Sequence, residues 1–455
     1  MPGLRTRAQL YFAIGLGLLT LMGVPQPAYA VPSYARQTGL ACEACHTVFP
    51  QLTPFGRVFK ASGYTLFNTR KVQDIDQQKR STLSLSDLPP VSAMVMASSS
   101  FAARANDSVS SKSSTDLPQQ ISLFYAGHIS DNVGAFIQLT YDDQSGSFGI
   151  DNTDIRFADV AAVNGHNLIY GISLNNNPTV QDLWNSTPAW GEPFIDSPNL
   201  QSPAAGSQIE GAMAQTVAGL SAYVFVDESL YAEVGVYRSA LQGASVANNG
   251  GANNMIISGV APYWRVAYEQ DWGKNSLEFG TLGEYAALVN PLTPAGAAIN
   301  GSLQNALTDR FLDAGFDAQY QYIDDNDQIS VTSRWIHENQ NLSASYAAGY
   351  ADKRSDALET FNLIGSYFLD RKIGGSLGYY RVVSSTDATY FGTNFGNSNS
   401  SWGTAEIDYL PWLNVKLGLK YTAFMKFDGA SSNYDGAGRK ASDNNMLFGF
   451  LWTAF

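Results

Sequence analysis

The chain has 455 residues, and its 40 Asp and Glu against 27 Lys and Arg give a formal net charge of −13. This acidic balance argues against nucleic acid as a partner. The sequence is rich in Gly, Tyr, Phe, Asn and Ser, and charged residues make up only 15% of it. That composition is typical of outer-membrane barrels, whose strand signal is weak in any one segment.

Residues 1–30 have the pattern of a secretory signal peptide. Arg5 and Arg7 precede a mostly apolar stretch, and Ala28-Tyr29-Ala30 fits a cleavage site. We therefore expect a mature chain that starts at Val31, outside the cytoplasmic membrane. Beyond this point no apolar run approaches the ~20 residues that a membrane-spanning helix needs.

The pentapeptide Cys42-Glu43-Ala44-Cys45-His46 contains both cysteines of the chain. C-x-x-C-H is the haem attachment signature, because two thiols one helical turn apart can bond to a single haem while the adjacent imidazole binds its iron. The alternative is a dithiol or disulfide, although a loop of two residues constrains the unfolded chain very little. The pattern predicts a redox protein with one covalent haem c on Cys42 and Cys45, and with His46 as the proximal iron ligand.

Residues 31–88 are the only part of the chain with a helical pattern. A short helix built on Phe55, Val58 and Phe59 is expected to end at Gly63-Tyr64. A linker rich in Ser, Asp and Lys follows. So few residues bury little core of their own, and a haem would supply most of the apolar surface. We predict a monohaem cytochrome c segment with its linker over 31–88.

Residues 89–455 show the period-two alternation of strands with one apolar and one polar face. The clearest cases are 133–141, 312–322 and 413–427. A strand of about ten residues can cross a bilayer when tilted, whereas strands of soluble sandwiches are usually near 5–6 residues long. The pattern predicts a transmembrane antiparallel β-barrel in the bacterial outer membrane, in contact with its lipid.

Turn signals give the number of strands. Tight polar turns alternate with eight connections that are mostly longer, which predicts sixteen strands rather than fourteen or eighteen. In outer-membrane barrels the short turns face the periplasm, so an even count also places the haem segment on the periplasmic side. The seven predicted tight turns are Asp131-Asn132, Asn164-Gly165, Asp227-Glu228, Trp272-Gly273-Lys274, Asp324-Asp325-Asn326, Asp370-Arg371 and Leu410-Pro411.

The connection 181–207 is the longest and the most aromatic of the long loops, and it is the third of them along the chain. In general porins the third loop folds inward, so this loop either packs on the haem segment or forms a rigid surface loop. Acidic residues on predicted outer loops either attract a divalent cation or are simply solvated. They are Asp142, Asp143, Glu192 and Asp196.

The distal ligand of the haem iron is not evident from the sequence. Met raises the potential of a haem relative to His, and Met94 and Met96 are the first methionines after the motif, on the first predicted strand. The alternative is that both side chains only pack. His128, His166 and His337 are expected to be ordinary strand or turn residues.

The tract from Thr38 to Lys60, followed by Gly63-Tyr64, resembles the fused monohaem cytochrome–porins of the outer membrane. These are best known as the ferrous iron oxidases of iron-oxidising bacteria. The specific match covers about residues 34–67. Residues 176–185 and 188–191 are also similar to the family, and the barrel matches it by architecture. The resemblance implies electron transfer from an extracellular donor, Fe(II) or another reduced species, to a periplasmic cytochrome or copper protein.

Three functions remain open at this point. The first is an Fe(II)-oxidising electron conduit whose lumen is plugged by the haem segment. The second is a solute porin with a tethered periplasmic cytochrome as carrier or gate, which is compatible with Asp313, Asp317 and Asp408 on the predicted lumen face. The third is a haem-based sensor or structural barrel without net electron flux.

Overall fold

The computed structural model describes residues 32–47, 50–66, 90–105, 111–142, 146–189, 196–241, 244–245, 256–289, 308–412 and 414–455. The predicted signal peptide and most of the predicted linker lie outside these residues. Within them, no helix combines the length and the apolar character needed to cross a membrane.

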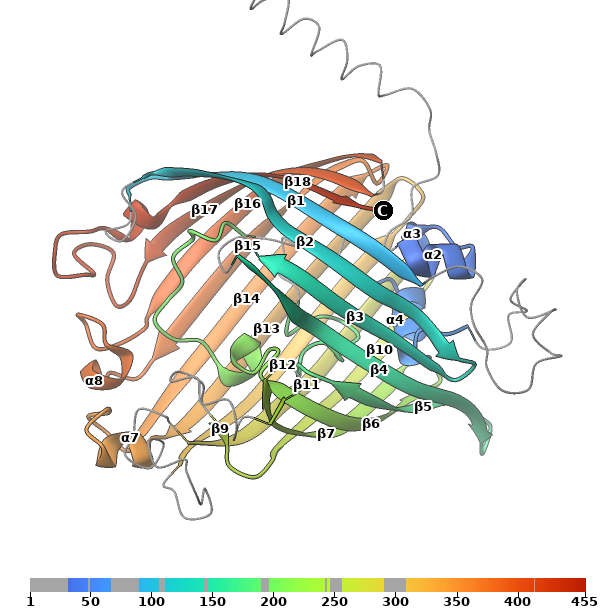
Figure 1. The fold of residues 1–455 in the computed structure, drawn as a ribbon, viewed down its shortest axis with the longest axis horizontal. Coiled ribbons are helices and arrows are strands. Elements are labelled where there is room, and N and C mark those ends of the chain that lie inside the picture. Colours follow the sequence, from blue (N-terminus) through green and yellow to red (C-terminus); the bar gives the residue numbers. More distant parts are fainter. Residues whose placement is uncertain are drawn as a thin grey trace, which may run out of the picture.

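Within the described residues, sixteen long antiparallel strands close into a barrel (Figure 1). Closure comes from β1, which pairs with both β2 and β18, and it leaves no strand edge exposed in lipid. The predicted number of strands is confirmed. Two short strands, β8 (Ala244–Ser245) and β9 (Ile256–Ile257), lie in the connection between β7 and β10.

The sixteen barrel strands have these bounds: β1 Val91–Ala102, β2 Ser113–Ser130, β3 Val133–Asp142, β4 Ser147–Val163, β5 His166–Asn175, β6 Val217–Val226, β7 Leu230–Leu241, β10 Ala261–Trp272, β11 Asn275–Val289, β12 Asp309–Ile323, β13 Asp327–Asn341, β14 Ser355–Leu369, β15 Ile373–Ser384, β16 Ser400–Trp412, β17 Val415–Lys426 and β18 Met446–Ala454.

Six of the seven predicted tight turns join consecutive strands where expected, and the seventh prediction was wrong. Leu410 and Pro411 belong to β16, and the chain turns only after Trp412. Pro411 has no N–H to donate, but the pairing with β17 shifts register between Tyr409 and Trp412. Such a bulge accommodates a proline inside a strand, so the turn signal at this position was misleading.

The two faces of the strands differ as a membrane barrel requires. On β12, Leu312 and Phe316 are exposed on the outside, while Asp313 and Asp317 are buried in the lumen. On β17, Leu417 is exposed and Lys420 is buried. An apolar outer band over a polar interior is the pattern of a barrel in the outer membrane.

The N-terminal segment forms three short helices inside one mouth of the barrel, and we call residues 32–66 the plug. The helices are α2 (Pro32–Thr38), α3 (Cys42–Cys45) and α4 (Pro54–Ala61). Figure 1 shows them at the end opposite α7 (Ser343–Ala347) and α8 (Ala388–Phe391), which lie in long loops. The plug therefore lies at the end with the tight turns, which faces the periplasm.

The connection between β5 and β6 folds into the lumen over its described residues, 176–189 and 196–216 (Figure 1). We call this connection L3. Its Trp184 is 1% exposed, and its π-helical turn η1 (Gln208–Ala212) donates backbone N–H groups to Asp313 and Glu338 on the inner wall. Of the two alternatives left open for 181–207, the described residues of L3 adopt the inward one; Trp190 and Phe194 lie outside the described residues.

A charge on the outer face should destabilise the barrel according to its depth in the bilayer. Phe316 lies in the middle of β12, whereas Ile329 is exposed near the start of β13. We expect Phe316→Arg to cost roughly 2–4 kcal/mol and the matched Ile329→Arg about 0–1 kcal/mol. Denaturant titration in lipid vesicles measures both values, and equal costs would contradict this assignment of depth.

Candidate functional site

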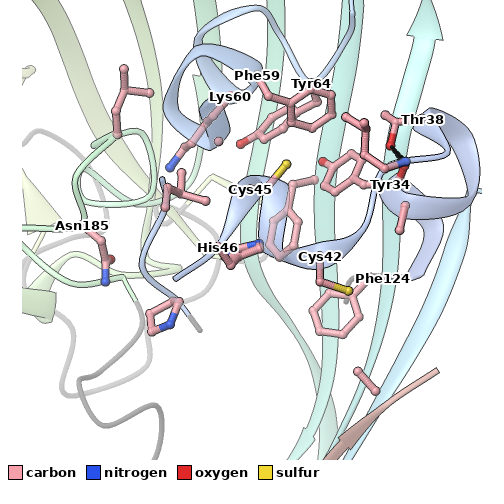
Figure 2. Close-up of a pocket in the computed structure, with 18 of the residues that line it drawn as sticks. Tyr34, Thr38, Cys42, Cys45, His46, Phe59, Lys60, Tyr64, Phe124 and Asn185 are labelled. Atoms are coloured by element: carbon pink, nitrogen blue, oxygen red, sulfur yellow. Dashed lines mark hydrogen bonds between the residues drawn. The ribbon is translucent and has the colours of Figure 1, made fainter. Parts of the chain in front are cut away.

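The C-x-x-C-H residues line a cavity between the plug, the barrel wall and L3 (Figure 2). It encloses about 1290 Å³, part of which is open to solvent. We call it the haem-motif cavity. Its lining residues are Tyr34, Ala35, Thr38, Leu40, Ala41, Cys42, Cys45, His46, Pro50, Leu52, Gly56, Phe59, Lys60, Tyr64, Met94, Phe124, Phe136, Gln138, Asp182, Leu183, Asn185, Trp452 and Ala454.

The imidazole of His46 is arranged as an iron ligand would be. Its Nδ1 lies 3.3 Å from the carbonyl oxygen of Gln51, which can accept an N–H from the ring. A hydrogen bond of this kind fixes the tautomer and ring orientation of metal-binding histidines. Burial lowers the pKa of His46 to about 4, which keeps the ring in the neutral form that metals require.

The two cysteines lie three positions apart on α3, one turn of helix, and they are not joined in a disulfide. Burial, and to a smaller extent the neighbouring Cys42, raise the pKa of the Cys45 thiol to about 11. Both side chains line the cavity together with His46. Both thiols and the imidazole thus face one cavity, as attachment of a haem through two thioethers would require.

Two glycines allow the plug to pack closely enough to form the cavity. A Cβ on Gly56 of α4 would lie 2.2 Å from the carbonyl oxygen of Cys45, so only glycine lets α4 approach α3. A Cβ on Gly134 of β3 would lie 2.1 Å from the carbonyl oxygen of Gly63. Gly134 thus brings the plug against the barrel wall.

Aromatic rings make the interior of the haem-motif cavity apolar. Tyr34 stacks on Tyr64 with ring centroids 5.5 Å apart and meets Phe59 edge to face at 5.3 Å. The Tyr34 hydroxyl donates to the Ala135 carbonyl and the Tyr64 hydroxyl donates to Asp154, so both of these hydroxyls are hydrogen-bonded. An apolar cavity with aromatic walls, two thiols and one oriented imidazole fits a covalently attached haem.

The structure separates the two methionine candidates. Met94 lines the haem-motif cavity, whereas Met96 packs in the same apolar cluster without lining it. The three remaining histidines do not line it. His128 contacts Gln37 of the plug, His166 pairs with Asp227 in a turn, and His337 pairs with Glu359.

Of the four acidic residues predicted on outer loops, the structure describes two. Asp142 ends β3, and Asp196 of L3 pairs with Lys420 of β17. Asp143 and Glu192 lie outside the described residues. Within the described part of the chain, no group of three or more His, Cys, Asp and Glu side chains is arranged to hold a metal ion.

Buried polar contacts hold the plug in the lumen. The Arg57 guanidinium donates to Glu269 at 2.7 Å, to Ser276 and to Gln319 and Gln321, all on the barrel wall. No local sequence pattern indicated the ion pair of Arg57 with Glu269, because the two residues are more than two hundred positions apart in the chain.

The plug also contacts L3 and the far side of the mouth. Glu269 accepts a second bond from the Trp184 indole, and Lys60 donates to the carbonyls of Val180 and Asp182. Burial lowers the pKa of Lys60 to about 8. Glu43 of α3 pairs at 3.2 Å with Arg371 in a turn across the barrel. The plug thus extends across the lumen.

No protein-family model and no curated protein matches the sequence. Similar solved structures include OmpF of Salmonella typhi in complex with daunomycin and an anion-selective porin of Comamonas acidovorans. Both are 11% identical with a TM-score of 0.46, and they cover 80% of this chain and 97% and 98% of their own.

The outer membrane channel DcaP of Acinetobacter baumannii is also similar, at 12% identity and a TM-score of 0.44 over 80% of this chain and 96% of its own. The closed barrel and its apolar outer band have the pattern of a barrel in the outer membrane. This protein is an outer-membrane β-barrel. The barrel alone does not distinguish a solute channel from an electron conduit.

Removal of the Arg57 side chain should release the plug. Arg57→Met leaves Glu269 buried without its cation, which we expect to cost about 3–5 kcal/mol. In planar bilayers the variant should show porin-like conductance steps that the wild type lacks. Arg36→Met is the matched control, since Arg36 is exposed and donates only to the Val91 carbonyl. Equal conductance of wild type and both variants would contradict this anchoring role.

Proposed function

We propose that the protein is an outer-membrane electron conduit of the cytochrome–porin kind. Electrons pass from an extracellular donor, Fe(II), through one haem c on Cys42 and Cys45 to a periplasmic cytochrome or copper protein. The observation that carries the proposal is the position of the haem-motif cavity. It lies inside the barrel, with the plug, the barrel wall and L3 all contributing to its walls, so one cofactor there lies between the two compartments.

The residues of the cavity suit a one-electron carrier. A haem supplies an iron that cycles between ferric and ferrous states, and axial ligands, burial and hydrogen bonding set its potential. His46 is held by the Gln51 carbonyl. The aromatic walls exclude water, and the buried ammonium of Lys60 lines the cavity. A cation at this position favours the reduced state, as an acceptor for ferrous iron requires.

A solute porin with the cytochrome as a gate is the second candidate. A polar chamber between L3 and strands β13–β17 favours it, because such a space would pass small solutes once the plug moved. A carrier that hangs in the periplasm is supported less well. The plug makes buried contacts with the barrel wall through Arg57 and with L3 through Lys60, which a freely tethered domain would lack.

The conduit predicts electron transfer from ferrous ion to the haem. In stopped flow, haem-loaded protein mixed with excess ferrous ion should show the spectrum of reduced haem, and a periplasmic cytochrome or copper protein should reoxidise it. His46→Gly should keep its covalent haem but lose this response, because the proximal ligand is gone. Haem that stays oxidised would rule out the iron assignment, whereas large conductance in haem-loaded wild type would favour the porin.

The position of Met94 predicts that it, and not Met96, is the distal ligand. Met94→Leu should abolish the near-infrared sulfur-to-iron band of the oxidised protein and lower the midpoint potential, because thioether ligation raises it. Met96→Leu is the matched control, from the same face of β1 and the same apolar cluster. A Met94→Leu protein with an unchanged band and potential would exclude ligation by Met94.

A further inference from the structure

A second cavity lies in the lumen beside the haem-motif cavity. It encloses about 970 Å³ between L3 and the inner faces of β13–β17. We call it the lumen chamber. Hydroxyl and amide side chains line much of it, among them Thr332, Asn362 and Thr404. Its lining is therefore more polar than that of the haem-motif cavity.

The wall between the two cavities is one residue thick in places. Asn185 of L3 lines both, and Figure 2 shows it on the side of the haem-motif cavity away from Phe124. Gln51 lines the lumen chamber, while the next residue, Leu52, lines the haem-motif cavity. Because the Gln51 carbonyl also binds His46, a solute in the chamber contacts the residue that orients the proximal imidazole.

The two basic side chains that line the lumen chamber from the barrel wall contact residues of L3. Arg334 of β13 donates to the Ser186 carbonyl and to Glu210, and Lys420 of β17 pairs with Asp196. Within the described residues no carboxylate or imidazole cluster is arranged to ligate a metal. The chamber therefore suits a solute that keeps its own oxygen ligands and is held by hydrogen bonds to them.

We propose that the lumen chamber is the docking site of the electron donor, and that the donor is a small ferrous species whose ligands are water or carboxylate oxygens. This inference rests on the proposed function. The ferrous ion gives up one electron and keeps its ligands as it becomes ferric, and the electron reduces the haem iron from ferric to ferrous. No bond forms or breaks. The volume of the chamber lies in the range of small-ligand pockets, which suits a small donor.

A matched pair of cysteine variants tests the chamber. Ser202 is exposed and lines it, whereas Ser432 is exposed in the loop between β17 and β18 and does not. Haem-loaded Ser202→Cys and Ser432→Cys are each modified with a dye maleimide, since their native cysteines carry the haem. Modified Ser202→Cys should be reduced by ferrous ion about tenfold more slowly or worse, because the donor no longer approaches. Modified Ser432→Cys should match the wild type.

A second measurement reports binding without electron transfer. Redox-inert zinc citrate should slow the maleimide reaction of Ser202→Cys and leave that of Ser432→Cys unchanged. Ferrous sulfate and ferrous citrate, used as separate donors, show whether water or carboxylate ligands give faster reduction of the haem. If the donor docks in the chamber, the dye on Ser202→Cys slows the reduction by at least one of the two.

The outcomes separate the two proposals. If modified Ser202→Cys is reduced as fast as the unmodified protein, or if a ferrous chelate on a large dextran reduces the haem as fast as the free chelate, donor docking in the chamber is overturned while the conduit stands. If unmodified wild type is not reduced by any ferrous donor, the proposed function fails, and the chamber proposal fails with it.

Discussion

The carboxylate of Glu269 accepts hydrogen bonds from the Arg57 guanidinium of the plug and from the Trp184 indole of L3. A buried carboxylate is costly unless it is paired and hydrogen-bonded, so the position of the plug and the position of L3 depend on each other through this one side chain. Loss of either partner would leave a charge or a donor unmatched in the lumen. The haem-motif cavity is enclosed by these two elements, joined at Glu269, together with the wall formed by β1–β3 and β18.

Barrel closure is what makes such internal packing necessary. Lipid allows no unpaired strand edge, and a closed barrel of sixteen strands has a lumen wider than its own side chains can fill. Here the plug and L3 fill much of it, and several of the buried charges are paired. Arg265 of β10, for example, contacts Asp182 of L3 as well as Glu278 and Asp317 of the neighbouring strands. Polar lumen faces that would line water in an open porin are mostly buried.

The sequence predicts local features well and long-range contacts poorly. Period-two alternation marks β12 and β17 because each strand has a lipid face and a lumen face. Turn residues such as Asn164-Gly165 mark their hairpins because positive φ is required there. The spacing of Cys42, Cys45 and His46 can be interpreted from the sequence because the three residues lie within about one helical turn. The Arg57–Glu269 pair and the position of Asn185 depend on how the whole barrel closes, which no local pattern indicates. Pro411 gave a wrong turn prediction because a register shift in β16 accommodates a residue without an N–H.

The walls of the haem-motif cavity include Met94 of the first barrel strand and Trp452 and Ala454 of the last. Those strands are neighbours only because the barrel is closed, with Met94 opposite Ala454 and Met96 opposite Trp452. The cavity is therefore incomplete until the seam between β1 and β18 has closed. A chain whose seam is still open lacks part of the wall around Cys42, Cys45 and His46, so the enclosure of these residues depends on closure of the barrel.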